Sequence, residues 1–555
     1  MINKIKFKFG SSQTKPPLAS DLTPITVFVG PNNSGKSKVL TEIETFCRNG
    51  QLNTTNVILE DLDFSQLHDP ETEINNHTLA PRRNESLQPE HIFFGKENTR
   101  HQLRRPQLLS FFSNVATHKH QYCVYYVSFN TIRLDGGSRI NLIKQQPAGD
   151  LQSLPDNSLQ VLFKDNTKRK ELRRIIYDAF KKYFVIDPTN LGNLRIRLSD
   201  VAPTNDIQER GIHEDAVQFH NNALDITLAS DGVKAFTGIM TTIIAGDPKV
   251  ILIDEPEAFL HPSLASNLGK EVSNSVNGSF KNLFVSTHSA NFLMGCIQSG
   301  TPLNIVRLTF SNNVPTARIL PSDKVLKLMR HPLLRSTGVL NGLFYEYVIV
   351  TEGDADRAFY QEINERLLAF APLRGIPNCL FLNAQNYQTI HEIMKPLREM
   401  GIPCASIVDV DVVKNGGATW TNLLGSAFVP EVTINSTGVS RGNINTRFEA
   451  KLPFKFKTNG GVDILEPTDK EACNNLFDQL DEYGIFAVRK GELESWLKTL
   501  GATGHGPDWL VDIFEKIGED PTTSTYIKPT TGDVWDFIAR IKIWFSNPTR
   551  KGTPE

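Results

Sequence analysis

Cysteine is scarce in this sequence, with six residues in a chain of 555. The six are scattered, and no two of them form a C-x-x-C pair. This spacing argues against a structural zinc site and against a disulfide framework, and it suits a reducing compartment.

Long apolar runs are also missing. No stretch approaches the length that spans a bilayer, and the N-terminal residues from Met1 to Ile5 do not resemble a signal peptide. We therefore expect a soluble cytoplasmic protein with no membrane partner.

An excess of one charge is absent as well, because 59 basic residues face 61 acidic ones. Any contact with nucleic acid must then come from a local patch rather than from the overall field. The length predicts two or three domains.

A glycine-rich segment near the N-terminus matches the phosphate-binding pattern G-x-x-x-x-G-K-[ST], with residues Gly30, Pro31, Asn32, Asn33, Ser34, Gly35, Lys36 and Ser37. An apolar strand precedes it and a helical pattern follows, as the P-loop requires. Its backbone N–H groups would face phosphate oxygens, Lys36 would reach the β- and γ-phosphates, and Ser37 would hold Mg²⁺. ATP is the expected nucleotide.

A second nucleotide motif begins at Val250, where an apolar strand ends in Asp254 and Glu255. Packing alone rarely places two acids at the end of a buried strand. We expect Asp254 to hold Mg²⁺ and Glu255 to polarise the attacking water. His288 ends the next apolar strand, where it can contact the γ-phosphate.

The segment Leu228 to Lys234 precedes this strand and contains Ser230 and Gly232. Together with the two motifs above, it resembles ABC-type ATPase domains of the SMC-like class. In that class two heads sandwich ATP, which implies a homodimer or higher oligomer with Ser230 and Gly232 contacting the nucleotide of the other head. The segment has one residue more than the usual signature, and the Q-loop glutamine is not located.

A second α/β unit begins near residue 345. One apolar strand ends at Glu352, a helix starts near Asp356, and a later strand ends in Asp409 and Asp411. Alternating strands and helices predict a parallel sheet whose carboxyl edge gathers these acids. Such crowding needs cations, and oxygen ligands favour Mg²⁺ or Mn²⁺.

This E-G-x-x-D and D-x-D arrangement resembles the TOPRIM domain. OLD-like TOPRIM nucleases have a further Gly-acid-x-Glu segment that supplies a metal carboxylate, and Glu492 and Glu494 occupy it here. Which of the two is the ligand stays open, with Glu494 slightly favoured. An acidic helix start is an almost equally good reading of this segment.

The predicted organisation is an ATPase domain over residues 1–320, a helical linker over 321–344 and a TOPRIM domain over 345–555. A polar insertion or mobile loop is expected at about 53–120, and residues 122–129, directly after it, predict a buried strand. A helical arm with a solvated charged face is expected at about 165–225.

A second insertion is expected at about 412–484, and an amphipathic helix should close the chain. Basic side chains in the two insertions are candidates for DNA contact, although a solvated face is the favoured reading of the first set: Arg82, Arg83, Arg100, Arg104 and Arg105 in the first, and Arg441, Arg447, Lys451, Lys455 and Lys457 in the second. His118 and His120 have little support as metal ligands.

An ABC-type ATPase joined to a TOPRIM domain is the architecture of the OLD (overcoming lysogenisation defect) family, to which the Gabija nuclease subunit is related. The resemblance implies an ATP-regulated, Mg²⁺-dependent DNA endonuclease of antiphage defence, with a second defence component as a further partner. Carboxylates at one sheet edge can themselves support phosphodiester hydrolysis through bound cations.

Three other functions compete with this reading. A topoisomerase would need a tyrosine nucleophile in a recognisable context, and a primase would need a template-binding module; neither is found. An ATP-gated sensor or scaffold with a silent TOPRIM domain, binding a partner or toxin, is the remaining alternative.

Overall fold

The computed structural model describes residues 1–96, 99–311, 313–320, 338–453 and 455–554, with residues 323, 325, 326 and 330 between them. The chain divides into two compact units, one made of Met1–Val29 and Asn33–Ser322 and the other of Asp323–Glu555 with Gly30–Asn32. Most of the predicted linker at 321–344 lies outside the described residues; its end forms η4, a 3₁₀ helix at Val339–Phe344. No helix in the described part of the chain is long and apolar enough to cross a bilayer.

The first unit is built on a six-stranded sheet in the order β16-β15-β3-β14-β13-β8. All neighbours are parallel except the β15–β16 pair. The strands are β3 (Ile25–Val29), β8 (Thr131–Leu134), β13 (Val250–Asp254), β14 (Asn282–Ser286), β15 (Leu303–Ser311) and β16 (Val314–Leu320). The central strands are buried along nearly their whole length, which explains their unbroken apolar runs.

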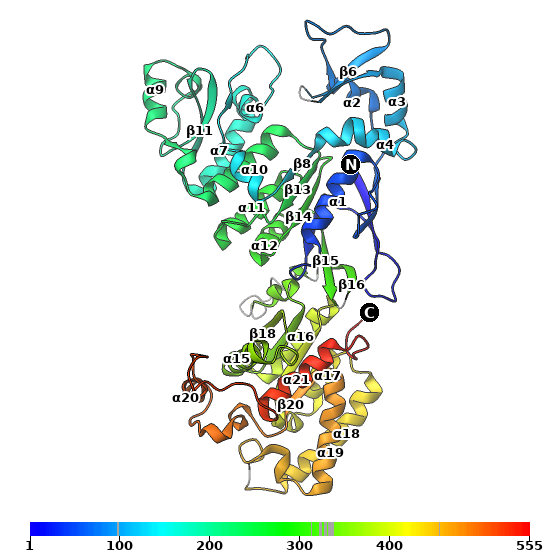
Figure 1. Cartoon of the computed structure of the whole chain (residues 1–555), viewed down its shortest axis with the longest axis vertical. Coiled ribbons are helices and arrows are strands. Elements are labelled where there is room, and N and C mark those ends of the chain that lie inside the picture. The colour runs from blue at the N-terminus through cyan, green and yellow to red at the C-terminus, as the bar shows by residue number, and fades with distance from the viewer. Residues whose placement is uncertain are drawn as a thin grey trace. The chain divides into compact units, whose positions relative to one another are not determined.

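Helix α1 (Lys36–Asn49) packs between this sheet and a smaller antiparallel one made of β1 (Ile2–Phe7), β2 (Ala19–Asp21) and β4 (Leu59–Phe64). Its buried face, which includes Val39, Leu40 and Ile43, belongs to the same core cluster as residues from both sheets. In Figure 1, α1 lies on one side of the large sheet, and α11 (Pro262–Asn274) and α12 (Ala290–Gln298) lie on the other. This sheet therefore has helices on both faces.

The polar stretch at about 53–120 is not the loop that its weak periodicity predicts. It contains α2 (Pro70–Asn76), α3 (Arg105–Ser113), α4 (Lys119–Tyr122) and an antiparallel sheet of β5 (Thr78–Leu79), β6 (His91–Lys96) and β7 (Thr99–Arg104). Its apolar side chains are few but well buried, and Phe94 and Phe112 pack edge to face at 5.6 Å. A small aromatic core thus compensates for the polar composition.

The predicted strand at 122–129 is wrong. Residues Cys123–Val127 form a π-helix, η1, and Ser128–Asn130 form the 3₁₀ helix η2, so the strand of this region is β8, which starts only at Thr131. An apolar run of this length fits a buried helix as well as a strand. Here the tyrosines pack on the aromatic core described above, where Tyr122 and Tyr126 are both buried.

The predicted arm contains strands as well as helices. The region from residue 136 to residue 228, which includes the predicted arm at about 165–225, comprises α5 (Gly136–Asn141), β9 (Gln146–Pro147), α6 (Ser158–Lys164), α7 (Asn166–Phe180), β10 (Tyr183–Asn190), β11 (Asn193–Ser199), α8 (Asp206–Arg210), α9 (Glu214–Asn221), β12 (Leu224–Asp225) and η3 (Ile226–Leu228). The charged face of α7 is not simply solvated, because Arg169 is buried and pairs with Glu209 at 3.1 Å. Helix α10 (Asp231–Gly246) returns the chain to the large sheet.

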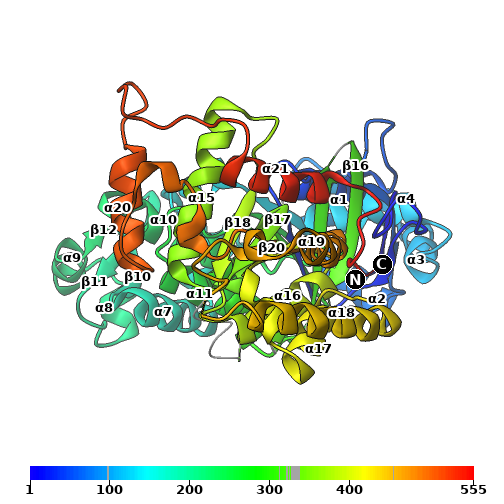
Figure 2. The ribbon, with the colours of Figure 1, turned by 90° about the horizontal axis from the view of Figure 1, so that it is seen from below.

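The second unit is built on a four-stranded, fully parallel sheet in the order β18-β17-β19-β20. The strands are β17 (Tyr347–Thr351), β18 (Cys379–Asn383), β19 (Cys404–Asp409) and β20 (Ile485–Val488). Helices α15 (Asp354–Phe370) and α21 (Asp533–Ser546) cover one face and α16 (Ile390–Glu399) covers the other (Figure 2). The α/β class expected for both halves of the chain is therefore confirmed.

The closing helix α21 supplies core side chains, as its spacing predicts, with Trp535, Phe537, Ile538 and Ile541 buried. Ile543 is the exception, since it is 71% exposed. The stretch at 412–484 contains more helix than its composition suggests: η6 (Val410–Lys414), α17 (Gly417–Ser426), α18 (Glu431–Glu449), η7 (Gly461–Ile464) and α19 (Pro467–Glu482).

Candidate functional site

The phosphate-binding pattern forms a turn between β3 and α1. The backbone is left-handed at Asn33 (φ 61°) and at Gly35 (φ 94°), directly before the helix starts at Lys36. The positive φ of Gly35 favours glycine there, and a Cβ would lie 2.5 Å from the end of the Ile58 side chain, which would have to shift. The turn therefore brings its N–H groups to the start of α1, as an anion site requires.

Lys36 lies buried within this turn. Burial lowers the pKa of Lys36 to about 8, although the charges of Glu255 and Asp254 oppose the shift. Its Nζ lies 3.5 Å from the Ser34 hydroxyl oxygen. A cation held in so little water gains more from an anionic ligand than an exposed lysine would.

Two motifs that are far apart in the sequence meet at Asp254. The Ser37 hydroxyl donates to Asp254 Oδ1 at 2.9 Å, and the Ser286 hydroxyl donates to the same oxygen. Asp254 and Ser286 are also direct partners in the β13–β14 register. The carboxyl edge of the parallel sheet thus places the predicted Mg²⁺ ligands Ser37 and Asp254 together.

Glu255 and His288 also lie together, with His288 Nε2 3.5 Å from Glu255 Oε1. The Glu255 side chain is half exposed, and the His288 N–H donates to Glu257 Oε1 at 2.8 Å. Burial, followed by the charge of Lys36, lowers the pKa of His288. A neutral imidazole beside a solvent-accessible carboxylate can accept or donate a hydrogen bond at this edge.

Arg139 is a residue of this site that the motifs do not reveal. It is 2% exposed, and its guanidinium donates to the Glu255 carbonyl at 2.6 Å and to the Asp254 carbonyl at 2.7 Å. Glu255 has a left-handed backbone (φ 48°), which costs free energy in a non-glycine residue and needs such support. No local pattern marks an arginine that acts on a strand more than a hundred residues away.

Ser230 and Gly232 lie at the exposed start of α10, where Ser230 is the N-cap residue. A Cβ at Gly232 would lie 2.7 Å from the Phe259 carbonyl oxygen, so the helix start packs closely on the chain that follows β13. Leu228 beside it is 76% exposed. The segment thus presents backbone N–H groups of a helix start to its surroundings, as a trans contact requires.

The second cluster lies at the carboxyl edge of the parallel sheet in the second unit. Glu352 follows β17 and Asp409 ends β19, and the Asp409 N–H donates to Glu352 Oε1 at 2.8 Å. Burial, reinforced by neighbouring carboxylates, raises the pKa of both residues, and it raises the pKa of Asp356 to about 7. The sheet therefore brings together acids that repel one another.

Lys457 supplies a positive charge inside this cluster. Its Nζ lies 2.8 Å from Asp409 Oδ2, 3.8 Å from Asp411 Oδ2 and 3.8 Å from Glu492 Oε2. The sequence suggests only a DNA-facing role for this residue. Other basic residues of the same stretch also face protein: Arg441 donates to the Val413 carbonyl and Lys451 pairs with Glu466 at 2.6 Å.

Glu492 and Glu494 both lie near the cluster, and their carboxylates are held by different hydrogen-bond partners. The Glu492 carboxylate caps η8 (Leu493–Ser495), whereas Glu494 Oε1 accepts the Gly506 N–H at 2.7 Å and lies 2.7 Å from His505 Nδ1. Among the described residues, Glu492, Glu494 and His505 form the one set of His, Cys, Asp or Glu side chains whose ligand atoms all lie within 4.8 Å of one another. His505 is not predicted; the glycines around it in sequence are its only signal.

Carboxylate oxygens dominate this donor set, and burial, with repulsion from neighbouring carboxylates, raises the pKa values of these acids. Both features fit a hard divalent cation such as Mg²⁺ or Mn²⁺. The residues present therefore fit the metal that the sequence predicts.

The arginines of the first insertion pair with acids of the same insertion: Arg100 with Glu85, Arg104 with Glu90, and Arg105 with Glu71. Arg104 and Arg105 are partly exposed, which agrees with the favoured solvated face, whereas the Arg100 side chain is only 8% exposed and does not fit it. His118 and His120 belong to no set of possible metal ligands within the described residues.

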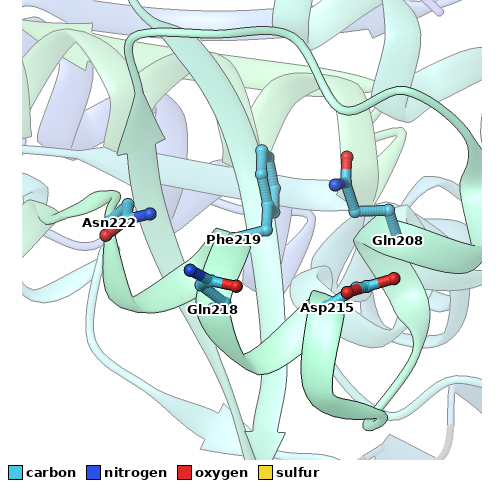
Figure 3. Close-up of a pocket in the computed structure, with 5 residues that line it drawn as sticks. All are labelled: Gln208, Asp215, Gln218, Phe219 and Asn222. Carbon is cyan, nitrogen blue, oxygen red and sulfur yellow. The ribbon is translucent and has the colours of Figure 1, made fainter.

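A small pocket of about 220 Å³ lies on the arm, lined by Gln208, Asp215, Gln218, Phe219 and Asn222 (Figure 3). Its lining is mostly amide, and none of these residues belongs to either acidic cluster.

Two domain families match the chain. Residues 161–294 match AAA_21, described as an AAA domain, putative AbiEii toxin, Type IV TA system. Residues 343–411 match the OLD-like TOPRIM family, described as overcoming lysogenization defect protein-like, TOPRIM domain. The second match includes Glu352, Asp356, Asp409 and Asp411.

One curated relative is the Old nuclease of Escherichia phage P2, which is 24% identical over 261 residues. The alignment covers 44% of this chain and 43% of that protein, so the chain matches less than half of its relative's length. Solved structures include an SMC head bound to the C-winged helix domain of ScpA (TM-score 0.34, 14% identity, 59% of this chain and 99% of that one). The SMC head domain from Thermotoga maritima has a TM-score of 0.31 at 13% identity, covering 58% of this chain and 99% of that one.

The two domain matches occur in the order that the motifs predict, and each one overlaps one of the two parallel sheets described above. The chain therefore combines a match to an AAA domain with a match to an OLD-like TOPRIM domain, and it is similar to an Old nuclease.

Proposed function

We propose that this protein is an ATP-regulated, divalent-metal-dependent DNA endonuclease. The observation that carries the proposal is the meeting of Glu352 and Asp409 at neighbouring strand ends, where the pKa of Asp356 is raised to about 7. Buried acids that crowd together without a structural need are a mark of a functional site. The activity of the P2 relative supports the same reaction class.

In this proposal the metal ligands are Glu352, Asp409 and Asp411, assisted by Asp356, Glu492 and Glu494. A divalent cation here supplies activation of water and stabilisation of the leaving oxygen in phosphodiester hydrolysis. Mg²⁺ is the expected ion, and Mn²⁺ is an alternative with the same oxygen preference.

The chain itself holds these ligands in place. The Asp409 N–H fixes Glu352 Oε1, and the Gly506 N–H fixes Glu494 Oε1. Carboxylates that are already oriented lose little entropy when a charged ligand arrives. This preorganisation supports a role in chemistry rather than in folding.

At the other sheet edge, Lys36 and the N–H groups of residues 30–37 would bind the phosphates of ATP. Ser37 and Asp254 would hold its Mg²⁺, Glu255 would polarise the attacking water, and His288 would contact the γ-phosphate. Arg139 would act as a positioning residue, because it holds the backbone of Asp254 and Glu255.

The exposed start of α10 supports assembly of two heads around ATP. Ser230 and Gly232 have a use in catalysis only if they meet the nucleotide of a second copy, and most homo-oligomers are symmetric. Nucleotide-dependent association would then link ATP to DNA cleavage. A role in antiphage defence, with a second protein component, is the biological setting that the family suggests.

An ATP-gated sensor or scaffold is the second candidate function. The pairing of Lys457 with Asp409 favours it, because an internal cation could keep a carboxylate cluster silent. Cleavage of plasmid DNA by the wild type with Mg²⁺ or Mn²⁺, with and without ATP, decides between the two functions.

Lys36→Ala should lose ATP binding and hydrolysis, because no other residue of the turn neutralises the β- and γ-phosphates in this assignment. We expect turnover to fall on the order of 10²-fold. Lys38→Ala is the matched control, since Lys38 is exposed two residues along α1. Unchanged affinity and turnover in Lys36→Ala would refute the ATPase assignment.

Ser230→Arg should still bind ATP but should neither hydrolyse it nor form the ATP-dependent oligomer, since a bulky cation replaces the helix cap. Light scattering with ATP in a Glu255→Gln background, which slows hydrolysis, measures the mass. Asn222→Arg, exposed on the same arm, should behave as the parent. A parent that stays monomeric with and without ATP contradicts the two-head assembly.

Asp409→Ala should abolish DNA cleavage, with a loss on the order of 10²–10³ in rate, because a ligand at the centre of the cluster is removed. ATP hydrolysis should persist, since Lys36, Asp254 and Glu255 belong to the other unit. Asp469→Ala removes an acid of the same unit that pairs with Arg447, and it should cleave normally. Normal cleavage by Asp409→Ala would exclude the TOPRIM cluster as the nuclease.

Binding of Mn²⁺ to the second cluster should tighten by about tenfold or more between about pH 6 and about pH 8, because the carboxyls must lose protons before they bind metal. The pKa of Asp356 is raised to about 7, and the pKa values of Glu352 and Asp409 are also raised. Without metal, in EDTA, the free energy of unfolding should change with pH in the opposite direction. A carboxyl whose pKa is higher in the folded than in the unfolded state binds its proton more tightly when folded, so this unit should lose stability as pH rises from about 4 to about 8. Calorimetry measures the Mn²⁺ affinity at each pH, and thermal unfolding measures the stability in EDTA at each pH. If neither quantity changed with pH, the raised pKa values would be contradicted.

A further inference from the structure

We propose that Lys457 is a tethered cation that occupies the acidic cluster when divalent metal is absent and competes with the metal for Asp409. The inference rests on the proposed metal function of this cluster and adds a residue that regulates it. Lys457 would thereby set the metal concentration at which the cluster fills.

The geometry places the ammonium group where charge is needed most. It lies 2.8 Å from Asp409 Oδ2, and Asp411 Oδ2 and Glu492 Oε2 each lie at 3.8 Å. The three acids come from two chain segments: Asp409 and Asp411 from the end of β19 and the η6 turn that follows it, and Glu492 from the stretch after β20. A single ammonium therefore compensates carboxylates that would otherwise repel one another.

The chain fixes the backbone that carries this lysine. The Gly461 N–H donates to the Phe456 carbonyl, and the Val462 N–H donates to the Arg489 carbonyl, both at 2.8 Å. Phe456 stacks on Phe448 with the ring centroids 4.2 Å apart. The turn that precedes η7 is thus anchored both to α18 and to the chain after β20.

Gly491 brings the lysine backbone directly beside the acids. A Cβ at Gly491 would lie 2.1 Å from the Lys457 carbonyl oxygen, and the glycine has a left-handed backbone (φ 133°). Only glycine allows the two chains to approach so closely. This contact sets the Lys457 backbone against the residue that precedes Glu492.

The ammonium group can nevertheless leave. The Lys457 side chain is 32% exposed, and four rotatable carbon bonds link its charge to the fixed backbone. A divalent ion bound to Asp409 would stand next to the ammonium, and two cations at that distance repel. Metal entry therefore requires the lysine to swing out, where its charge can meet a phosphate of the substrate.

Calorimetric titration with Mn²⁺ alone, without DNA or nucleotide, tests the competition. All proteins carry Asp254→Asn, so that the other acidic edge contributes little binding. Lys457→Met should bind Mn²⁺ about tenfold more tightly than its parent, whereas Lys457→Arg, which keeps the charge, should not. Lys455→Met removes an exposed lysine of the same turn and should match the parent.

Thermal unfolding provides a second readout that does not depend on activity. In EDTA, Lys457→Met should unfold at a lower temperature than the parent because the carboxylates lose their cation, and Mn²⁺ should raise its unfolding temperature by more than it raises that of the parent. Equal or weaker Mn²⁺ binding by Lys457→Met would overturn the competition and leave the proposed metal site intact. Absence of Mn²⁺ binding in the parent and in Lys457→Met alike would overturn the metal site itself.

Discussion

The repulsion between buried carboxylates at the edge of the second parallel sheet is the constraint around which that unit is arranged. Glu352, Asp356 and Asp409 are all held in surroundings that raise their pKa values. The free-energy cost of burying such carboxylates is typical of functional sites, where a bound cation offsets it or a reaction uses it. The long excursion between β19 and β20 gains a role in this light, because it carries Lys457 back to Asp409.

The first unit applies the same geometry to a different ligand. Its strands β13 and β14 end side by side, and Asp254 accepts hydrogen bonds from Ser286 and from Ser37 of the phosphate-binding turn. Here Asp254 meets the hydroxyls of Ser37 and Ser286, beside the buried Lys36 and the start of α1. One edge therefore suits a polyphosphate with its cation, while the other suits the cation itself.

The sequence predicts helices, strands and turns where a local pattern reflects the backbone conformation or the burial of that element. The turn at Gly30–Ser37 favours glycine at Gly35 because of its positive φ, and the strands that lead to Asp254, Glu352 and Asp409 are apolar because both faces are covered. The strand predicted at residues 122–129 is wrong for a physical reason. A short apolar run satisfies a buried helix or a buried strand equally, and the choice came from the aromatic core that it meets.

The sequence by itself determined which acids stand at strand ends and in what order, because local spacing and the parallel βα pattern are properties of the chain alone. Only the tertiary structure decided which groups compensate them. Arg139 reaches the Asp254 and Glu255 carbonyls, Lys457 reaches Asp409, and His505 reaches Glu494 across loops whose paths no periodicity encodes. Compensation of charge acts over distance in space, so its partners emerge only when the chain has folded.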